Sequence, residues 1–482
     1  MRNRQVGWGL LLLAAAGCTS LNAYVKPEGN GGWDSQRRRD ELAQRAARAG
    51  VTFPQPETVA APRPRSEILD LASVVAMAAH GNRRIAEATT SLAMAAEGVN
   101  DTRGRLLPST IGSGRYTWYT DPLGNQIHFP AVPVSAITIR DEHFGTINGT
   151  LTLPIDLSGE LRQTLKAAQA GYRGEQARLW ATTLEQEVAA VRSYFQLLET
   201  LRLREVTEQT LAVDRAQLDT ANARFANGRI TKNDLLVTQV ALRNAEQDLV
   251  RRNLAIDQAR RQLNQVIGTD VDAPTQIVDV HERPDLPEIN DLLQQAYEHN
   301  PALVGLVEER QRLEANATAL ERSRLPRLNA GGAIDYSTSA IVQPQQVGSG
   351  FAGFSWDLGT DTRREAQIAE AHLALDRNRV ATEAAMRELE NAIRSTRDVV
   401  AERLSALSTS AAAVGQAEEN LRIRQQQFTA GRAQSDDVLL AEALLSQQRA
   451  TLASALYQAH ARRAELQQLL GLALDPLLVI QR

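Results

Sequence analysis

The same series of segments occurs twice in this chain of 482 residues, and that duplication limits the possible folds more than any other feature. Residues 78–108 align with residues 296–326 at a constant offset of 218, without a gap. Residues 218–268 align with residues 421–471 at an offset of 203, again without a gap. A repeat of this length indicates a tandem duplication of one structural unit.

Each copy contains a long stretch without proline, the strongest helix breaker. These two stretches have 119 and 131 residues, and apolar residues return in them at steps of three and four, as on a coiled-coil-like face. Gly228 and Gly431 interrupt them, and each comes shortly before a Thr or Ser that can begin a new helix. We therefore predict a hairpin of long helices in each copy, at about 157–268 and about 358–470.

The segment before each pair of long helices has the composition of β-strands. Aromatic and β-branched residues gather there, and apolar residues alternate with polar ones. Turn residues interrupt each segment, so we predict one β-hairpin at about 109–156 and another at about 327–357. The first hairpin is longer, which predicts an external loop near residues 121–140. Four strands cannot close a barrel, and an open edge is not viable in lipid, so other chains would have to supply further strands.

The N-terminus resembles the export signal of a bacterial lipoprotein. Arg2 and Arg4 precede a short apolar run, and small residues then lead directly to Cys18, the single cysteine. We expect removal of residues 1–17 as a signal peptide and attachment of a lipid to the Cys18 thiol. The alternative is an ordinary cleaved signal in which Cys18 has no role. Residues 18–66 are rich in Gly, Pro and charge and are predicted to form a lipidated surface strap.

Other kinds of chemistry have no support in the sequence. The formal charge of -4 includes no basic excess, which argues against nucleic acid as a partner. The seven histidines lack paired ligand spacing, and no nucleophile elbow or Walker motif is present. We therefore predict no enzymatic activity, no metal site and no cofactor other than the covalent lipid on Cys18.

Together these features resemble the TolC-like outer-membrane efflux family, in its lipoprotein branch. The resemblance covers Ile68 to Gly471 and rests on the duplicated order of helix, Leu-Pro, strands, Asp-Leu, long helix, glycine turn and long helix. It implies a mainly α fold with a small β part, in which a homotrimer forms a 12-stranded outer-membrane barrel and an α-helical tunnel extending into the periplasm. The expected division is a first repeat, a linker, a second repeat and a C-terminal tail, at 67–271, 272–284, 285–471 and 472–482.

The function implied by this resemblance is that of an exit duct for small molecules in a tripartite efflux system. The implied partners are a periplasmic adaptor protein, an inner-membrane transporter and outer-membrane lipid. A duct for type I protein secretion is one alternative. A periplasmic adaptor or spacer is a weaker one, because adaptors lack a duplication of the whole unit. The transported substrate does not follow from the sequence, since a wide duct leaves selection to its partners.

The resemblance also implies where the periplasmic aperture lies. Helices that close a tunnel converge near their turns, here at Gly228 and Gly431. In the family, the helix after this turn carries aspartates that line the aperture, and Asp234 and Asp437 match by position, with Asp436 beside the latter. Three copies would place like charges in a ring, which favours cations.

Neighbouring residues leave alternatives open. The second aspartate of the family pattern is replaced by Val237 and Leu440, so Leu440 could form an apolar constriction instead. The matching aspartates could simply complement the dipole in the first turn of a helix. Arg229 and Arg432 could pair with these acids across helices, or be solvated near a helix C-terminus.

Overall fold

The computed structural model describes residues 68–120, 123–126, 136–280, 284, 286–339, 341–356 and 362–472. These residues belong to one compact unit that extends over 59–482. The predicted signal peptide, the strap and nearly all of the C-terminal tail lie outside the described residues. The lipid on Cys18 therefore stays a prediction.

Each repeat begins with a short helix and a longer one, separated by an asparagine. The side chain of Asn82 accepts a hydrogen bond from the amide of Arg84, and Asn300 accepts from the amides of Ala302 and Leu303. Both asparagines have extended backbone, so one helix ends there and the next begins with a capped N-terminus. The helices are α3 (Leu71–Gly81) and α4 (Arg83–Gly104) in the first repeat, and α7 (Ile289–His299) and α8 (Pro301–Arg322) in the second.

The predicted long helices are confirmed. They are α5 (Glu160–Ala226) and α6 (Lys232–Ile267) in the first repeat, and α9 (Thr362–Thr429) and α10 (Ser435–Leu470) in the second. α5 has 67 residues and α9 has 68, about 100 Å each at 1.5 Å per residue. Gly228 and Gly431 have positive φ at the turns that follow. Within the described part of the chain, no helix is both long and apolar enough to cross a bilayer.

The two repeats pack against each other along the long helices. α5 lies against α6 of its own repeat and against α8 and α10 of the other, and α9 lies against α8 and α10. The largest apolar cluster joins residues of α3, α5, α6 and α10, with the rings of Phe195 and Tyr457 stacked at 6.4 Å. The Tyr457 hydroxyl donates to Asp279 at 2.8 Å, so the linker between the repeats is tied to this core.

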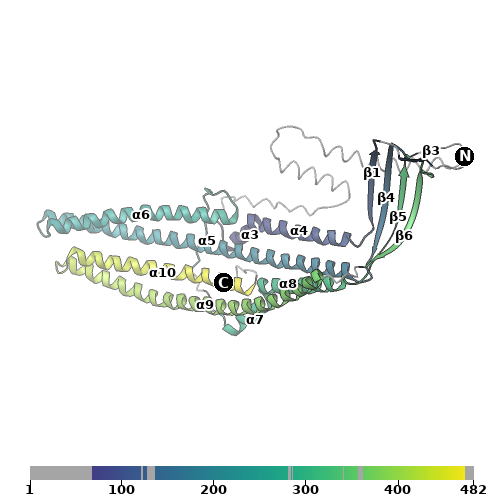
Figure 1. Cartoon of the computed structure of the whole chain (residues 1–482). Coiled ribbons are helices and arrows are strands. Elements are labelled where there is room, and N and C mark those ends of the chain that lie inside the picture. The colour runs from purple at the N-terminus through teal and green to yellow at the C-terminus, as the bar shows by residue number, and fades with distance from the viewer. Residues whose placement is uncertain are drawn as a thin grey trace, which may run out of the picture. The chain divides into compact units, whose positions relative to one another are not determined.

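The two β-hairpins join into one antiparallel sheet, in the order β1-β4-β5-β6. In Figure 1 this sheet lies at one end of the long helices, and the glycine turns lie at the other. The loop predicted near 121–140 contains a small separate hairpin that the sequence did not predict, and part of that loop lies outside the described residues. The strands are β1 (Ser109–Trp118), β2 (Leu123–Gln126), β3 (Ala136–Arg140), β4 (His143–Ile155), β5 (Arg327–Ser337) and β6 (Gln346–Ser355).

Candidate functional site

One face of the four-stranded sheet is mostly polar. Residues directly opposite in antiparallel strands point to the same side, so Asn148 of β4 shares a face with Ser113 of β1 and Asp335 of β5. The Asn148 amide donates to the Asp335 carboxylate, and the Thr150 hydroxyl donates to Asn148. Further polar members of this face are Ser109, Arg115, Thr117, Thr146, Thr152, Arg327, Asn329, Ser337, Ser349 and Ser355, with Ile111, Phe144, Pro154, Ala333, Val347 and Phe351 as apolar exceptions.

The opposite face is mostly apolar, although few side chains of the chain cover it. Tyr116 is 73% exposed and Phe354 is 69% exposed, which is unusual for large apolar residues in a sheet. The same face carries Trp118, Ile147, Leu151, Leu153, Ile155, Leu328, Ile334 and Tyr336. A sheet that is polar on one side and apolar on the other is suited to separate water from lipid.

The polar face contains one position where only glycine fits. A β-carbon on Gly331 would lie 2.1 Å from the carbonyl oxygen of Leu151 and 2.6 Å from the ring of Phe351. Gly331 is therefore covered by the Phe351 ring of the neighbouring strand. A glycine paired with a cross-strand aromatic is typical of a curved sheet.

Ion pairs hold the sheet to the long helices. Arg327, the first residue of β5, donates to both oxygens of Glu160 in α5, at 2.9 and 2.6 Å, and so joins the two repeats. Asp156 follows β4, and its carboxylate accepts from the amides of Leu161 and Arg162 at the start of α5. Burial raises the pKa of Asp156, but its hydrogen bonds to Arg162 and Leu161 outweigh burial and leave that pKa below its ordinary value. The aspartate of the Asp-Leu pair thus satisfies two first-turn amides of α5, in which Gly159 is the N-cap residue.

The two predicted aperture aspartates occupy equivalent positions at the far ends of the helices. Asp234 is in the first turn of α6, where its carboxylate accepts from the amide of Thr231 at 2.9 Å. Asp437 is in the first turn of α10 and accepts from the amide of Gln434 at 3.0 Å. Both belong to capping boxes, which is the first-turn role that the sequence left open. Their role at an aperture stays a prediction.

The other predicted tip residues lie on the surface. Leu440 is 73% exposed, and Asp436 is exposed as well. Arg229 and Arg432 are exposed, and within the described part of a single chain neither forms an ion pair with Asp234 or Asp437.

A contact between the two tips was missed by the sequence analysis. The guanidinium of Arg224 lies 3.9 Å from the ring centroid of Phe428, and it donates to the carbonyl oxygen of Thr429 at 3.3 Å. This contact ties the end of α5 to the end of α9. The two glycine turns indicated that both helix ends are tips, but nothing in the sequence indicated that Arg224 of one tip would reach the other.

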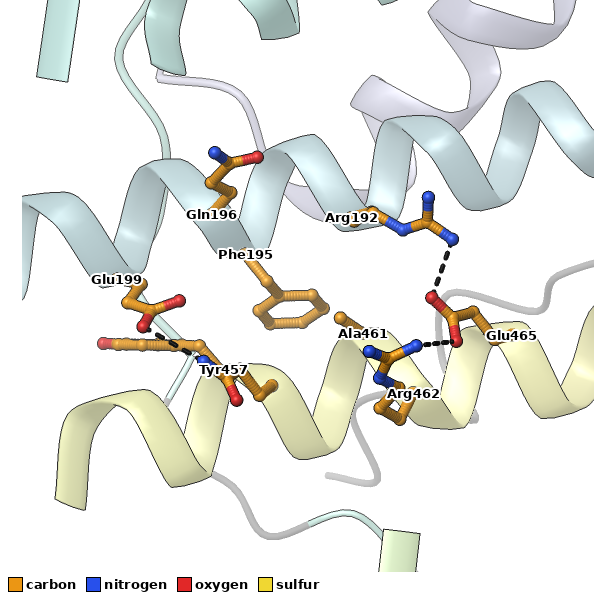
Figure 2. A pocket seen from close by; sticks show the side chains of 9 residues that line it. Arg192, Phe195, Gln196, Glu199, Tyr457, Ala461, Arg462 and Glu465 are labelled. Atoms are coloured by element: carbon orange, nitrogen blue, oxygen red, sulfur yellow. Dashed lines mark hydrogen bonds and ion pairs between the residues drawn. The ribbon is translucent and has the colours of Figure 1, made fainter. Parts of the chain in front are cut away.

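A pocket lined by charged and aromatic side chains lies between α5 and α10 (Figure 2). Its volume is about 440 Å³, and Phe195 and Tyr457 form its apolar part. Glu465 pairs with both Arg192 and Arg462 at 2.7 Å. These charged groups satisfy one another across the helices and do not form a set for acid–base or nucleophilic catalysis. Across the described ranges, no group of three or more His, Cys, Asp or Glu could hold a metal ion.

Comparison with known proteins matches the chain to one family model, described as outer membrane efflux protein, over residues 74–269 and 292–472. The fold is similar to VceC, an outer membrane protein of Vibrio cholerae, with a TM-score of 0.71 and 16% identity over 84% of this chain and 97% of VceC. CusC gives a TM-score of 0.73 and 16% identity over 84% of this chain and 92% of CusC. The CmeC outer membrane channel of Campylobacter jejuni gives 0.71 and 16% over 83% and 85%. No curated protein sequence matches the chain.

Proposed function

The chain belongs to the outer membrane efflux protein family, and from this premise we propose that it is a homotrimeric channel that serves as the exit duct of a tripartite efflux system. Members of this family are outer-membrane pores and not enzymes. The observation that carries the proposal is the four-stranded sheet, which is polar on one face and apolar on the other, at one end of helices about 100 Å long.

The edges of the sheet support a trimer. β1 and β6 are the outer strands, and in lipid their unpaired backbone groups would each cost several kcal/mol, up to about 7. Pairing β1 of one copy with β6 of the next removes both edges, and three copies give a closed barrel of twelve strands. The apolar face then meets lipid, and the polar face around Asn148 and Asp335 lines the water-filled interior.

Apolar residues on the outer surface of the helices support the same assembly. On α6, Leu236, Val240 and Leu254 are exposed, although each is an apolar residue on a mostly polar helix. Leu373 and Val380 of α9 are exposed too, two turns apart on one face. Contact with the helices of neighbouring copies would bury these side chains and continue the barrel as an α-helical tunnel.

The partners follow from this architecture. The duct contains no energy source, so we propose an inner-membrane transporter that drives export and a periplasmic adaptor that contacts the helix tips. A lipid on Cys18 would anchor the N-terminus in outer-membrane lipid. Small molecules are the proposed cargo, and the transporter would select them.

We further propose that Asp234 and Asp437 line the periplasmic aperture of the trimer, with Asp436, Leu440, Arg229 and Arg432 close to it. The capping boxes are compatible with this role, because each Asp shares only part of its acceptor capacity with the backbone. Six such carboxylates in a constriction would attract cations.

Single-channel recording in a planar bilayer tests the channel and its aperture together. We would compare the wild type with Asp234→Asn plus Asp437→Asn, because asparagine removes the charge and keeps a side-chain oxygen that can accept from the amide of the N-cap residue. We expect a trimer with a small cation-selective conductance whose selectivity falls in the double variant. The control is Asp257→Asn, which removes an exposed carboxylate on α6 away from the tip. A protein that remains monomeric and does not conduct would contradict the proposal.

A further inference from the structure

Two carboxylic acids are buried where the two repeats meet, a few turns from the helix tips. Asp214 of α5 is 6% exposed and Glu442 of α10 is 4% exposed. The two helices pack along each other, and the charge of Asp214 acts on Glu442. Two buried carboxylates that act on each other across a helix interface repel if both are ionised, so the pair favours a state that keeps at least one proton.

The surroundings of the pair provide few groups that would stabilise two negative charges. Glu442 Oε2 has no hydrogen-bond partner, and neither do Gln217 Nε2 and Ser435 Oγ, although all three side chains are at least nine-tenths buried. Gln217 lies one turn from Asp214 on the same face of α5, and Ser435 lies two turns from Glu442 on the same face of α10. Buried polar atoms without a partner thus lie on the same helix faces as both acids, so negative charge on the pair is poorly compensated.

The cations near the pair are held by other groups. Arg449 of α10, the cation that acts on Glu442, donates to Gln209 at 2.6 Å and to Glu418 of α9 at 2.8 Å. On the helices packed against the pair, charged residues at a similar level form ion pairs with each other: Arg243 with Glu246 on α6, and Arg422 with Glu419 on α9. Arg215 and Asp219, the nearest charged residues on α5 itself, are exposed.

Burial is the main cause of the proton affinity of the pair. It raises the pKa of Asp214, and it raises the pKa of Glu442 together with the Asp214 charge; Arg449 and the Thr210 hydroxyl oppose the second shift by smaller amounts. A raised carboxyl pKa stabilises the packed interface at low pH. That stability is lost as the pH rises from the ordinary carboxyl range through the raised pKa values.

We propose that Asp214 and Glu442 form a proton-binding site that holds the two repeats together near the tips while it is occupied and releases them when the proton leaves. Deprotonation puts two carboxylates in an interface that cannot pair them, and separation of α5 from α10 gives both access to water. This regulation rests on the proposed function, in which the tips form the closed end of the channel. Acid therefore favours the closed state, and a higher pH on the periplasmic side favours opening.

The duplication provides an internal comparison. The offset of 203 residues places Ala417 of α9 at the position equivalent to Asp214, and Gln239 of α6 at the position equivalent to Glu442. The equivalent positions of the other repeat thus carry no carboxyl pair. Gln239 also shows that a glutamine is compatible with a helix at this position. Glu442→Gln is therefore a conservative variant that removes the charge and keeps the size of the side chain.

The test uses the full-length, detergent-purified protein and two readouts. One readout is channel conductance between pH 5.5 and 8, a range above the ordinary carboxyl pKa values of 3.8 and 4.5. The other is hydrogen exchange of residues 435–445, corrected for the intrinsic effect of pH. We expect the ratio of open to closed channels in the wild type to rise with pH, by up to about tenfold for each unit by which the pKa differs between the two states. Exchange of residues 435–445 should rise in parallel.

In Glu442→Gln and Asp214→Asn, we expect both readouts to depend much less on pH than in the wild type, whereas the control Asp257→Asn, at an exposed position of α6 further from the tip, behaves like the wild type. Variants that keep the full pH dependence would overturn the proton-binding site. The two proposals fail in different ways. A protein that never conducts contradicts the channel, and its hydrogen exchange still tests the buried pair.

Discussion

At the scale of single residues, a few side chains fix how strands and helices meet. Asp156 satisfies first-turn amides of α5 at the exit from the sheet, Arg327 ties the start of β5 to Glu160, and Gly331 allows β5 to approach its neighbours closely. Each of these roles depends on local steric or electrostatic contacts. Substitution of these residues is therefore expected to weaken the fold and to leave the proposed aperture unchanged.

Gly331→Ala is expected to destabilise the sheet. The added methyl group would overlap the carbonyl oxygen of Leu151 in the central strand β4, which cannot move without breaking ladder hydrogen bonds. Overpacking of this kind costs roughly 1–3 kcal/mol, or more where backbone must shift. Gly149→Ala in β4 is the matched control, since nothing lies within 4 Å of a β-carbon there. The urea concentration at half-unfolding of the assembled protein distinguishes the two, and equal midpoints would contradict the steric account.

The buried pair and the contact between tips show why some residues escaped the sequence analysis. Glu442 lies on a helix whose apolar steps suggest a buried face, but the sequence does not indicate that this face would meet Asp214. Arg224 likewise resembles an ordinary C-terminal arginine until the Phe428 ring is seen beneath it. Contacts between helices distant in the chain depend on which faces pack, and one sequence does not determine that.

At the scale of elements, the glycines at helix ends are needed for different reasons, either for their positive φ alone or also for close packing. Gly228 and Gly431 have positive φ but open space around them, whereas Gly268 also lies against the end of α3. A β-carbon on Gly268 would be 2.5 Å from the carbonyl oxygen of Gly81. The equivalent Gly471 lies just as close to His299, at the end of α7.

We therefore expect Gly268→Ala to destabilise the protein considerably more than Gly228→Ala. The second change has only the conformational cost of a left-handed residue, about 1–2 kcal/mol. The first adds a clash between the new β-carbon and the carbonyl group of Gly81, and relief of that clash would require α3 to move away from α6. Thermal unfolding of the two single variants in the same detergent provides the measurement. Similar transition temperatures would show that the close approach of α3 is not important.

The helices and strands were predictable because the same sequence pattern for each of them occurs in both copies of the repeat. Long proline-free stretches with apolar steps predict α5, α6, α9 and α10, and alternation predicts the four main strands. The hairpin of β2 and β3 escaped prediction, since its short segments contain residues such as Gly124 and Asn125 that are more typical of turns. The pairing of β4 with β5, which joins the repeats, lies between segments far apart in the chain and has no local signal.

At the scale of the whole molecule, a single chain leaves surfaces exposed that proteins normally cover. Its sheet has two open edges, the apolar face of that sheet is exposed, and exposed apolar residues run along α6 and α9. A closed assembly of three copies accounts for all of these features together. The duplication explains why three copies suffice, because each chain already contributes two hairpins to the four-stranded sheet and two hairpins of long helices.

The most direct test of this assembly is crosslinking between the edge strands. Ser113 of β1 and Ser349 of β6 share the polar face, so cysteines placed there and at neighbouring positions of β6 would meet across the subunit boundary. Cys18 is left in place, because the lipid proposed on its thiol prevents disulfide formation, and a variant with only the β1 cysteine is the control that would detect any crosslink through Cys18. We predict covalent dimers and trimers of the chain under oxidising conditions, and no larger species. Monomers alone, or ladders beyond the trimer, would contradict a closed three-chain barrel.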